Sequence, residues 1–126
     1  MYSKELLKGT LSAIILKLLA DNNKMYGYQI TQMVKELSGE KILIKEGSLY
    51  PALHKLMADG LIEVETVNIG KRIRRYYTLT ENGVVVKNEK IKEIMNFMET
   101  IDNILSFRNL KLLQGFRWVS VKKKAA

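Results

Sequence analysis

The densest group of binding side chains in this chain is a run of cations, Lys71, Arg72, Arg74 and Arg75. Like charges this close repel one another unless an anion lies against them, and phosphate oxygens pair well with lysine and arginine. The formal net charge of the chain, +8, agrees with an anionic partner. The run therefore predicts binding to phosphate groups.

Side chains suited to catalysis are few. The sequence holds one histidine, His54, and no cysteine, and it lacks the HExxH and GxxxxGK motifs. It has no glycine-rich loop after a strand, and without cysteine it forms neither disulfides nor thiolate metal sites. We therefore expect a protein that is not an enzyme and that uses no cofactor or metal.

Helical spacing of apolar residues defines the segments that precede the cations. It predicts a first helix from Glu5 to Ala20, which the polar stretch 21–24 ends. A second, shorter helix begins near Tyr26 and stops at Ser38–Gly39, where serine and glycine are typical of a helix end. Both helices have one apolar face and can share a core.

A third helix contains the single proline of the chain, Pro51. Its inward face is predicted from three leucines at spacings of four and three: Leu49, Leu53 and Leu56. Proline costs about 3 kcal/mol inside a helix but little in the first turn, where its missing N–H has no partner to lose. We therefore expect Gly47 or Ser48 to be the N-cap, with Pro51 in or at the edge of the first turn.

The cations follow this helix in a region with a different period. Two segments within residues 61–79 alternate apolar and polar side chains, which is typical of strands. Asn68 and Gly70 between them can supply the positive φ angles of a tight loop, so the region is predicted to be an antiparallel hairpin. The expected register places Glu65 opposite Arg74, which would neutralise one cation.

A long helix is expected after the hairpin, capped by Thr80 and reaching residue 107. Its apolar surface is larger than one small domain covers, so packing on the first helix would take part of it and a second copy the rest. We predict a homodimer whose interface is formed by Leu7, Leu11, Ile91, Ile94, Met95, Met98, Ile101 and Leu105.

The order of these elements predicts a mainly α fold with a small antiparallel β hairpin, a winged helix-turn-helix followed by a long C-terminal dimerisation helix. The DNA-binding domain would cover residues 1–80 and the dimerisation helix 81–107. Residues 108–126 would form a basic, apolar tail of unassigned structure.

In a winged helix-turn-helix the helix before the hairpin enters the DNA major groove and the hairpin contacts the flanking backbone. The expected DNA contacts are Ser48, Tyr50, Pro51, His54, Lys55, Lys71, Arg72, Arg74 and Arg75. A solvated surface is the competing interpretation of the third helix alone, and the hairpin cations favour DNA. Two copies using all four cations would make about eight phosphate contacts, with a log–log salt slope of roughly −7.

Four stretches between Leu6 and Gly83 form a specific combination: LLKGTLSAIILKLL, YGYQI, EGSLYPALHKLMADGLI and RRYYTLTENG. In order and spacing they resemble the PadR family of bacterial transcriptional regulators. The resemblance implies a homodimeric repressor that binds a palindromic operator in double-stranded DNA. The single helix after the hairpin resembles the shorter subclass of the family.

The resemblance also bears on a small apolar or aromatic effector. Some similar proteins bind planar aromatic compounds between their C-terminal helices, with a tryptophan from each subunit stacking on the compound. The corresponding stretch here offers Ile94 and Phe97 and no tryptophan. An apolar effector site and a core without any ligand both stay open.

The tail supports a rival function. Residues 108–126 carry several cations and no acidic residue, so they could bind RNA or an anionic membrane while the helices serve only as a scaffold. No apolar run reaches the roughly 18 residues of a membrane span. Without cysteines or a signal-like N-terminus, the chain is expected in the cytoplasm.

Overall fold

The computed structural model of this chain describes residues 2–106. The predicted tail, residues 108–126, lies outside the described residues. The chain divides into two compact units, Met1–Ile91 and Lys92–Ala126, and each is described by itself. The predicted domain boundary at residue 80 lies within the first unit.

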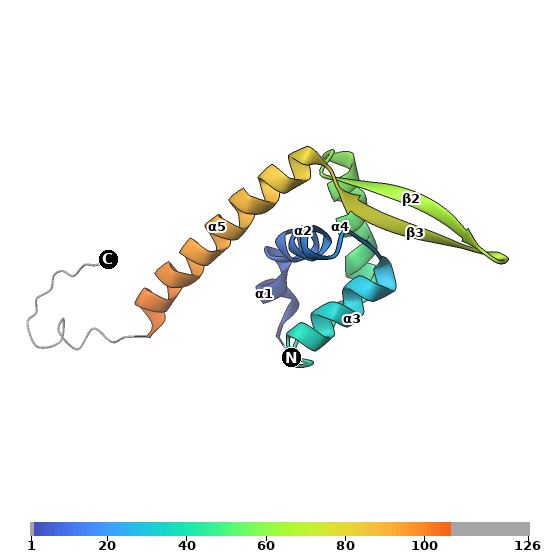
Figure 1. Cartoon of the computed structure of the whole chain (residues 1–126). Helices are drawn as coiled ribbons and strands as arrows, with labels where there is room; N and C mark the ends of the chain where they lie inside the picture. Colours follow the sequence, from blue (N-terminus) through green and yellow to red (C-terminus); the bar gives the residue numbers. More distant parts are fainter. Residues whose placement is uncertain (1, 107–126) are drawn as a thin grey trace, which may run out of the picture. The chain divides into compact units, whose positions relative to one another are not determined.

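Five helices and three strands make up the described part of the chain (Figure 1). In order they are α1 (Lys4–Lys8), α2 (Leu11–Asn22), β1 (Lys24–Tyr26), α3 (Gly27–Leu37), α4 (Glu46–Ala58), β2 (Ile62–Ile69), β3 (Arg72–Leu79) and α5 (Glu81–Leu105). The predicted fold class, mainly helical with a small antiparallel sheet and a long last helix, is confirmed.

The sequence predicted one continuous first helix, and this is wrong, because the structure has two helices, α1 and α2, in its place. The Ser3 hydroxyl accepts a hydrogen bond from the Leu6 N–H to begin α1, and Gly9 ends it. The Thr10 hydroxyl then donates to the Leu7 carbonyl, a local bond that competes with helix continuation. Glycine is a poor helix former, so the chain turns here although its apolar spacing continues.

The predicted start of the third helix is also wrong. The N-cap of α4 is Lys45, whose carbonyl accepts hydrogen bonds from the N–H groups of Ser48 and Leu49, each at 2.9 Å. Pro51 is therefore the sixth residue of α4 rather than part of its first turn. Its ring leaves the Gly47 carbonyl without the usual helical donor, and because Gly47 is exposed this carbonyl can bind water.

The predicted hairpin is present, and a third strand joins it. Strands β2 and β3 pair from Ile62 with Leu79 to Ile69 with Arg72, around a two-residue loop in which Gly70 has a φ of 62°. Asn68, expected to share that role, is an ordinary residue of β2. Strand β1 pairs with the inner end of β3, so the sheet order is β1-β3-β2.

The core of the first unit lies between the three helices α2, α3 and α4 and the inner part of the sheet. Its most deeply buried side chains are Ile15, Leu16, Leu19, Ile30, Leu49 and Leu53. Leu56 is buried as well, so the predicted inward face of the third helix is confirmed. This packing fixes which side of α4 faces solvent.

Thr80 caps α5, as predicted. Its hydroxyl accepts a hydrogen bond from the Gly83 N–H at 3.0 Å and donates to the Gly60 carbonyl at 2.7 Å. Gly83 is buried directly against the backbone of Leu61, and a Cβ at this position would collide with the Leu61 carbonyl oxygen. The start of α5 therefore lies too close to Leu61, which precedes β2, for any residue but glycine.

Replacing Gly83 with alanine should lower the free energy of unfolding by about 2 kcal/mol, because backbone must move to admit the new methyl group. Urea denaturation followed by circular dichroism measures the change. The matched control is Gly47→Ala in α4, where nothing lies within 4 Å of the added Cβ. Equal effects of the two substitutions would contradict this account of Gly83.

Candidate nucleic-acid interface

The solvent side of α4 carries the side chains expected to contact DNA. His54 and Lys55 are exposed, on the side away from the buried leucines. Lys55 is 3.4 Å from the Asp59 carboxylate, one helical turn away. Such an exposed pair is weak and can exchange for a phosphate or a base.

Tyr50 lies on one flank of this surface, against α3. A Cβ at Gly27 would lie 2.6 Å from the Tyr50 hydroxyl oxygen, so the ring reaches the start of α3 because residue 27 is glycine. The Tyr50 side chain is 37% exposed. It is positioned by packing and still reaches solvent.

Ser48 and Pro51 lie on the other flank. Both line a groove of about 670 Å³ that is bounded by α1, α2 and the residues before α4. The predicted set on α4 therefore divides into an outer surface with His54 and Lys55, one flank where Tyr50 packs on α3, and another where Ser48 and Pro51 line the groove.

Arg74 is partly buried and lies against an aromatic ring. Its guanidinium lies 4.0 Å from the centre of the Tyr26 ring, a cation–π contact. The Tyr26 ring meets the Tyr76 ring edge-on at 5.5 Å. Contact with an aromatic face stabilises the position of the Arg74 guanidinium.

The predicted pairing of Glu65 with Arg74 is wrong, because the register is shifted. Glu65 lies opposite Tyr76, and Arg74 lies opposite Val67. Glu65 instead forms an ion pair of 3.6 Å with Lys24, which belongs to the strand that the sequence did not predict.

The remaining hairpin cations, Lys71, Arg72 and Arg75, are exposed. Burial raises the pKa of the Tyr77 phenol, the nearby Tyr50 raises it further, and Arg75 lowers it. Arg75 and Tyr77 are two residues apart in β3 and so share one face of the strand. Tyr77 is buried in the core with the inward leucines of α4, so this face of the hairpin is the one directed toward the helices.

The residues expected at a dimer interface lie on three helices. Leu7 of α1 and Leu11 of α2 are half-buried and line the groove that contains Ser48. On α5, Ile91, Ile94 and Ile101 are half-buried, whereas the rest are exposed: Met95, Met98 and Leu105. Phe97, expected to contact an effector, is also exposed.

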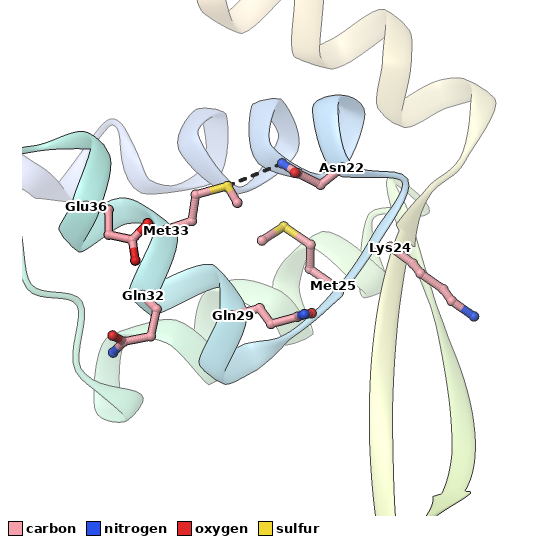
Figure 2. Close-up of a pocket in the computed structure, with 7 residues that line it drawn as sticks. All are labelled: Asn22, Lys24, Met25, Gln29, Gln32, Met33 and Glu36. Carbon is pink, nitrogen blue, oxygen red and sulfur yellow. Dashed lines mark hydrogen bonds between the residues drawn. The ribbon is translucent and has the colours of Figure 1, made fainter.

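A smaller pocket of about 270 Å³ lies between the end of α2, β1 and α3 (Figure 2). The Asn22 side-chain amide donates to the Met33 sulfur across it at 3.3 Å. Figure 2 shows the Lys24 side chain directed away from the other lining residues. Residues 2–106 contain no cluster of three metal-ligating side chains, and none of their helices is long and apolar enough to cross a membrane.

Sequence patterns missed the residues that organise the hairpin cations. Tyr26 and Lys24 lie in a three-residue strand, too short to show an alternating pattern. Their contacts join segments far apart in the chain. The YGY stretch marked Tyr26 as distinctive, but nothing local indicated that its ring supports an arginine.

Comparisons of sequence support one family. The chain matches the PadR-like family of transcriptional regulators over residues 15–89. It is 31% identical over 105 residues to an uncharacterized protein of Lysinibacillus sphaericus, covering 81% of this chain and 94% of that protein. It is 36% identical over 66 residues to the negative transcriptional regulator PadR of Bacillus subtilis, covering 52% of this chain and 36% of that protein.

Solved structures of transcriptional regulators have a similar fold. A transcriptional regulator from Clostridium thermocellum has a TM-score of 0.75 and 27% identity, over 81% of this chain and 99% of that one. Bacillus subtilis PadR in complex with operator DNA has a TM-score of 0.60 and 34% identity, over 65% of this chain and 46% of that one. The resemblance predicted from four short stretches is confirmed: this chain belongs to the PadR-like family of transcriptional regulators.

Proposed function

We propose that this chain is a dimeric repressor that binds a palindromic operator in duplex DNA, acts in the cytoplasm and catalyses no reaction. One observation carries the proposal: an exposed helix surface with His54 and Lys55 accompanies a hairpin with three exposed cations. This pairing suits a helix in the major groove and a hairpin on the flanking strand. The solved complex of the Bacillus subtilis relative with operator DNA supports it.

The dimer is supported by two apolar surfaces, one on each unit of the chain. The groove between α1, α2 and Ile42–Lys45 has a floor of leucines and isoleucines. Residues 92–105 of α5 carry large exposed apolar side chains: Met95, Phe97, Met98, Ile104 and Leu105. In the proposed dimer, α5 of a second chain covers the groove.

The charges of the two surfaces also favour the pairing of the groove with α5 of a second chain. The rim of the groove holds Lys4, Lys8 and Lys45 with one carboxylate, Glu5. Residues 92–105 of α5 hold more acidic than basic side chains. A helix of negative charge against a rim of positive charge gains affinity and a defined orientation.

An effector that releases the repressor stays a prediction. Ile94 and Phe97, the expected contacts, lie on adjacent turns of α5. A cleft at these residues would need the second subunit to supply its other wall. Wild-type dimer titrated with planar aromatic compounds tests this, with displacement from operator DNA as the measured response.

Selection of binding sites from a random DNA pool tests the central proposal. We expect enriched palindromes whose half-sites lie one helical turn apart, about 34 Å. A pool that shows no enrichment after repeated selection would overturn sequence-specific binding.

Two substitutions separate base contacts from phosphate contacts. Arg72→Ala should weaken binding to operator and random DNA by similar factors, because phosphate contacts are independent of sequence. Lys55→Ala should weaken operator binding more, by a factor of about ten, and change the preferred bases. Competition between fluorescent operator and unlabelled random DNA measures both. Equal losses on both DNAs for Lys55→Ala would count against base contact.

The rival function of the tail is tested by shortening the chain to end at Ser106. The proposal expects operator-selective binding to remain, because α4 and the hairpin are intact. Loss of operator selectivity, together with retained binding of the tail peptide to RNA or anionic vesicles, would favour the rival.

A further inference from the structure

The groove that contains Ser48 has the size of a small-molecule site. It has a volume of about 670 Å³ and lies between α1, α2, residues 42–45 and the start of α4. Ligand sites in proteins have volumes of roughly 300–1,000 Å³ and are mostly apolar, with a few polar groups that orient the ligand. The smaller pocket in Figure 2, of about 270 Å³, falls below that range. The larger groove is therefore the stronger candidate for a ligand site.

The floor of the groove is apolar and is formed by three parts of the first unit. It comprises Leu7 of α1, Leu11 and Ile14 of α2, and Ile42 and Ile44 of the segment before α4, all of which are half-buried. All of these except Leu7 also pack against the core, which holds the floor in place. Covering these side chains would remove apolar surface from water, so the floor favours a ligand with a hydrocarbon body.

The rim of the groove is cationic. Lys4, Lys8 and Lys45 line it together with one carboxylate, Glu5. All three lysines are exposed, and none of them forms an ion pair within residues 2–106. Their charges are therefore available to an anionic group on the ligand.

Two side chains at the start of α4 are placed to hold a carboxylate. Lys45 is the N-cap of α4, Ser48 follows in its first turn, and both line the groove. Within the described part of the chain the Ser48 hydroxyl has no hydrogen-bond partner, so it can donate to a ligand. The positive end of the α4 dipole at the same place also favours an anion.

We propose that this groove binds a single-chain amphipathic carboxylate of the fatty-acid class, and that the ligand releases the operator by displacing α5 of the second chain. The hydrocarbon chain lies on the apolar floor, and the carboxylate meets Lys45 and Ser48. The inference rests on the proposed dimeric repressor, in which α5 covers the same groove. It gives an effector a site separate from Ile94 and Phe97.

The ligand and α5 compete because they offer the groove the same chemistry. Residues 92–105 of α5 combine exposed apolar side chains with an excess of acidic ones. A fatty acid likewise combines a hydrocarbon body with a negative charge. The groove attracts both by burial of apolar surface and by the charge of its lysines, and one occupant excludes the other.

Mass action gives the size of the effect. A ligand that binds only the open groove multiplies the apparent dimer dissociation constant by the square of one plus the ratio of ligand concentration to Kd, because two grooves open when the dimer separates. At a ligand concentration of about ten times Kd, the increase is roughly a hundredfold. Operator affinity then falls toward the affinity of one subunit for a half-site.

Laurate, kept below its micellar concentration, is the probe. Calorimetric titration of the full chain gives the Kd, sedimentation equilibrium the dimer dissociation constant, and fluorescence anisotropy the operator affinity. We expect one laurate to bind per chain and the dimer dissociation constant to rise with the square dependence. Dodecyltrimethylammonium has an equally long chain but a positive charge, so it should bind at least about tenfold more weakly.

Two substitutions connect laurate binding to the groove. Ser48→Ala removes a hydrogen bond to the carboxylate and should weaken laurate binding by about tenfold. Lys45→Gln removes one exposed charge and should weaken it by about threefold. The matched control is Lys41→Gln, because Lys41 is an exposed lysine close in sequence that does not line the groove. It should leave the Kd unchanged.

The outcomes separate this inference from the proposed function. If laurate does not bind, or binds both groove variants as tightly as the wild type, the inference is overturned while the DNA-binding function stands. If laurate binds but the dimer and the operator affinity do not change, displacement of α5 is overturned. If dodecyltrimethylammonium binds as tightly as laurate, selection of a carboxylate is overturned. If no operator is selected from the random pool, the proposed function itself fails, and calorimetry still tests the groove.

Discussion

Operator affinity should fall roughly a thousandfold when monovalent salt is raised from 50 to 200 mM. Arg74 is partly buried against Tyr26, so we expect the three exposed cations of each hairpin to contact phosphate: Lys71, Arg72 and Arg75. Two subunits then make about six such contacts, and the log–log slope of affinity against salt should be near −5. This is shallower than the slope of roughly −7 expected when all four cations bind phosphate.

A matched pair of substitutions tests which cations contribute. Arg72→Gln should reduce the steepness of the slope by about 2 for the dimer, because one contact is lost from each subunit. Arg74→Gln removes the same charge two residues away and should change the slope by less than about 1. Titrations at four or more salt concentrations give the slopes. A wild-type slope near −2, or a larger effect of Arg74→Gln, would contradict this assignment.

The second large effect concerns the dimer. Met98→Asp should raise the dimer dissociation constant by at least about a hundredfold, because the proposed interface would bury an unpaired carboxylate. Met98 is 55% exposed within the described chain, so the fold of the subunit should be unaffected. Sedimentation equilibrium measures the association. Affinity for a full palindrome should fall toward the affinity for a single half-site.

The control is Asn103→Asp, which places the same charge on the polar side of α5, where Asn103 is exposed. It should leave the dimer intact. A Met98→Asp protein that remains dimeric at micromolar concentration would contradict the prediction that the apolar face of α5 that contains Met98 forms the interface.

The sequence predicted those parts of the fold that depend on local periodicity. Spacings of three and four in Leu49, Leu53 and Leu56 are enough to orient α4, since a helix repeats every 3.6 residues. The change to a period of two located β2 and β3. Thr80 was identified as a cap because threonine and a following acidic residue favour that position.

Other parts of the fold depend on contacts between distant residues, which the spacing of apolar residues does not reveal. A break at Gly9 and Thr10 leaves the apolar spacing unchanged, and Pro51 inside α4 is tolerated because the freed carbonyl is exposed. The register of β2 against β3 follows from the two-residue loop at Gly70, which alternation alone does not specify. The stacking of Arg74 on Tyr26 requires β1, whose three residues carry no pattern.

Tyr26 also connects two parts of the first unit. Its backbone N–H donates to the Gln29 side-chain oxygen at the start of α3, while its ring lies against the Arg74 guanidinium of β3. One residue therefore connects α3 to the hairpin, which should limit movement of the hairpin cations relative to the helices.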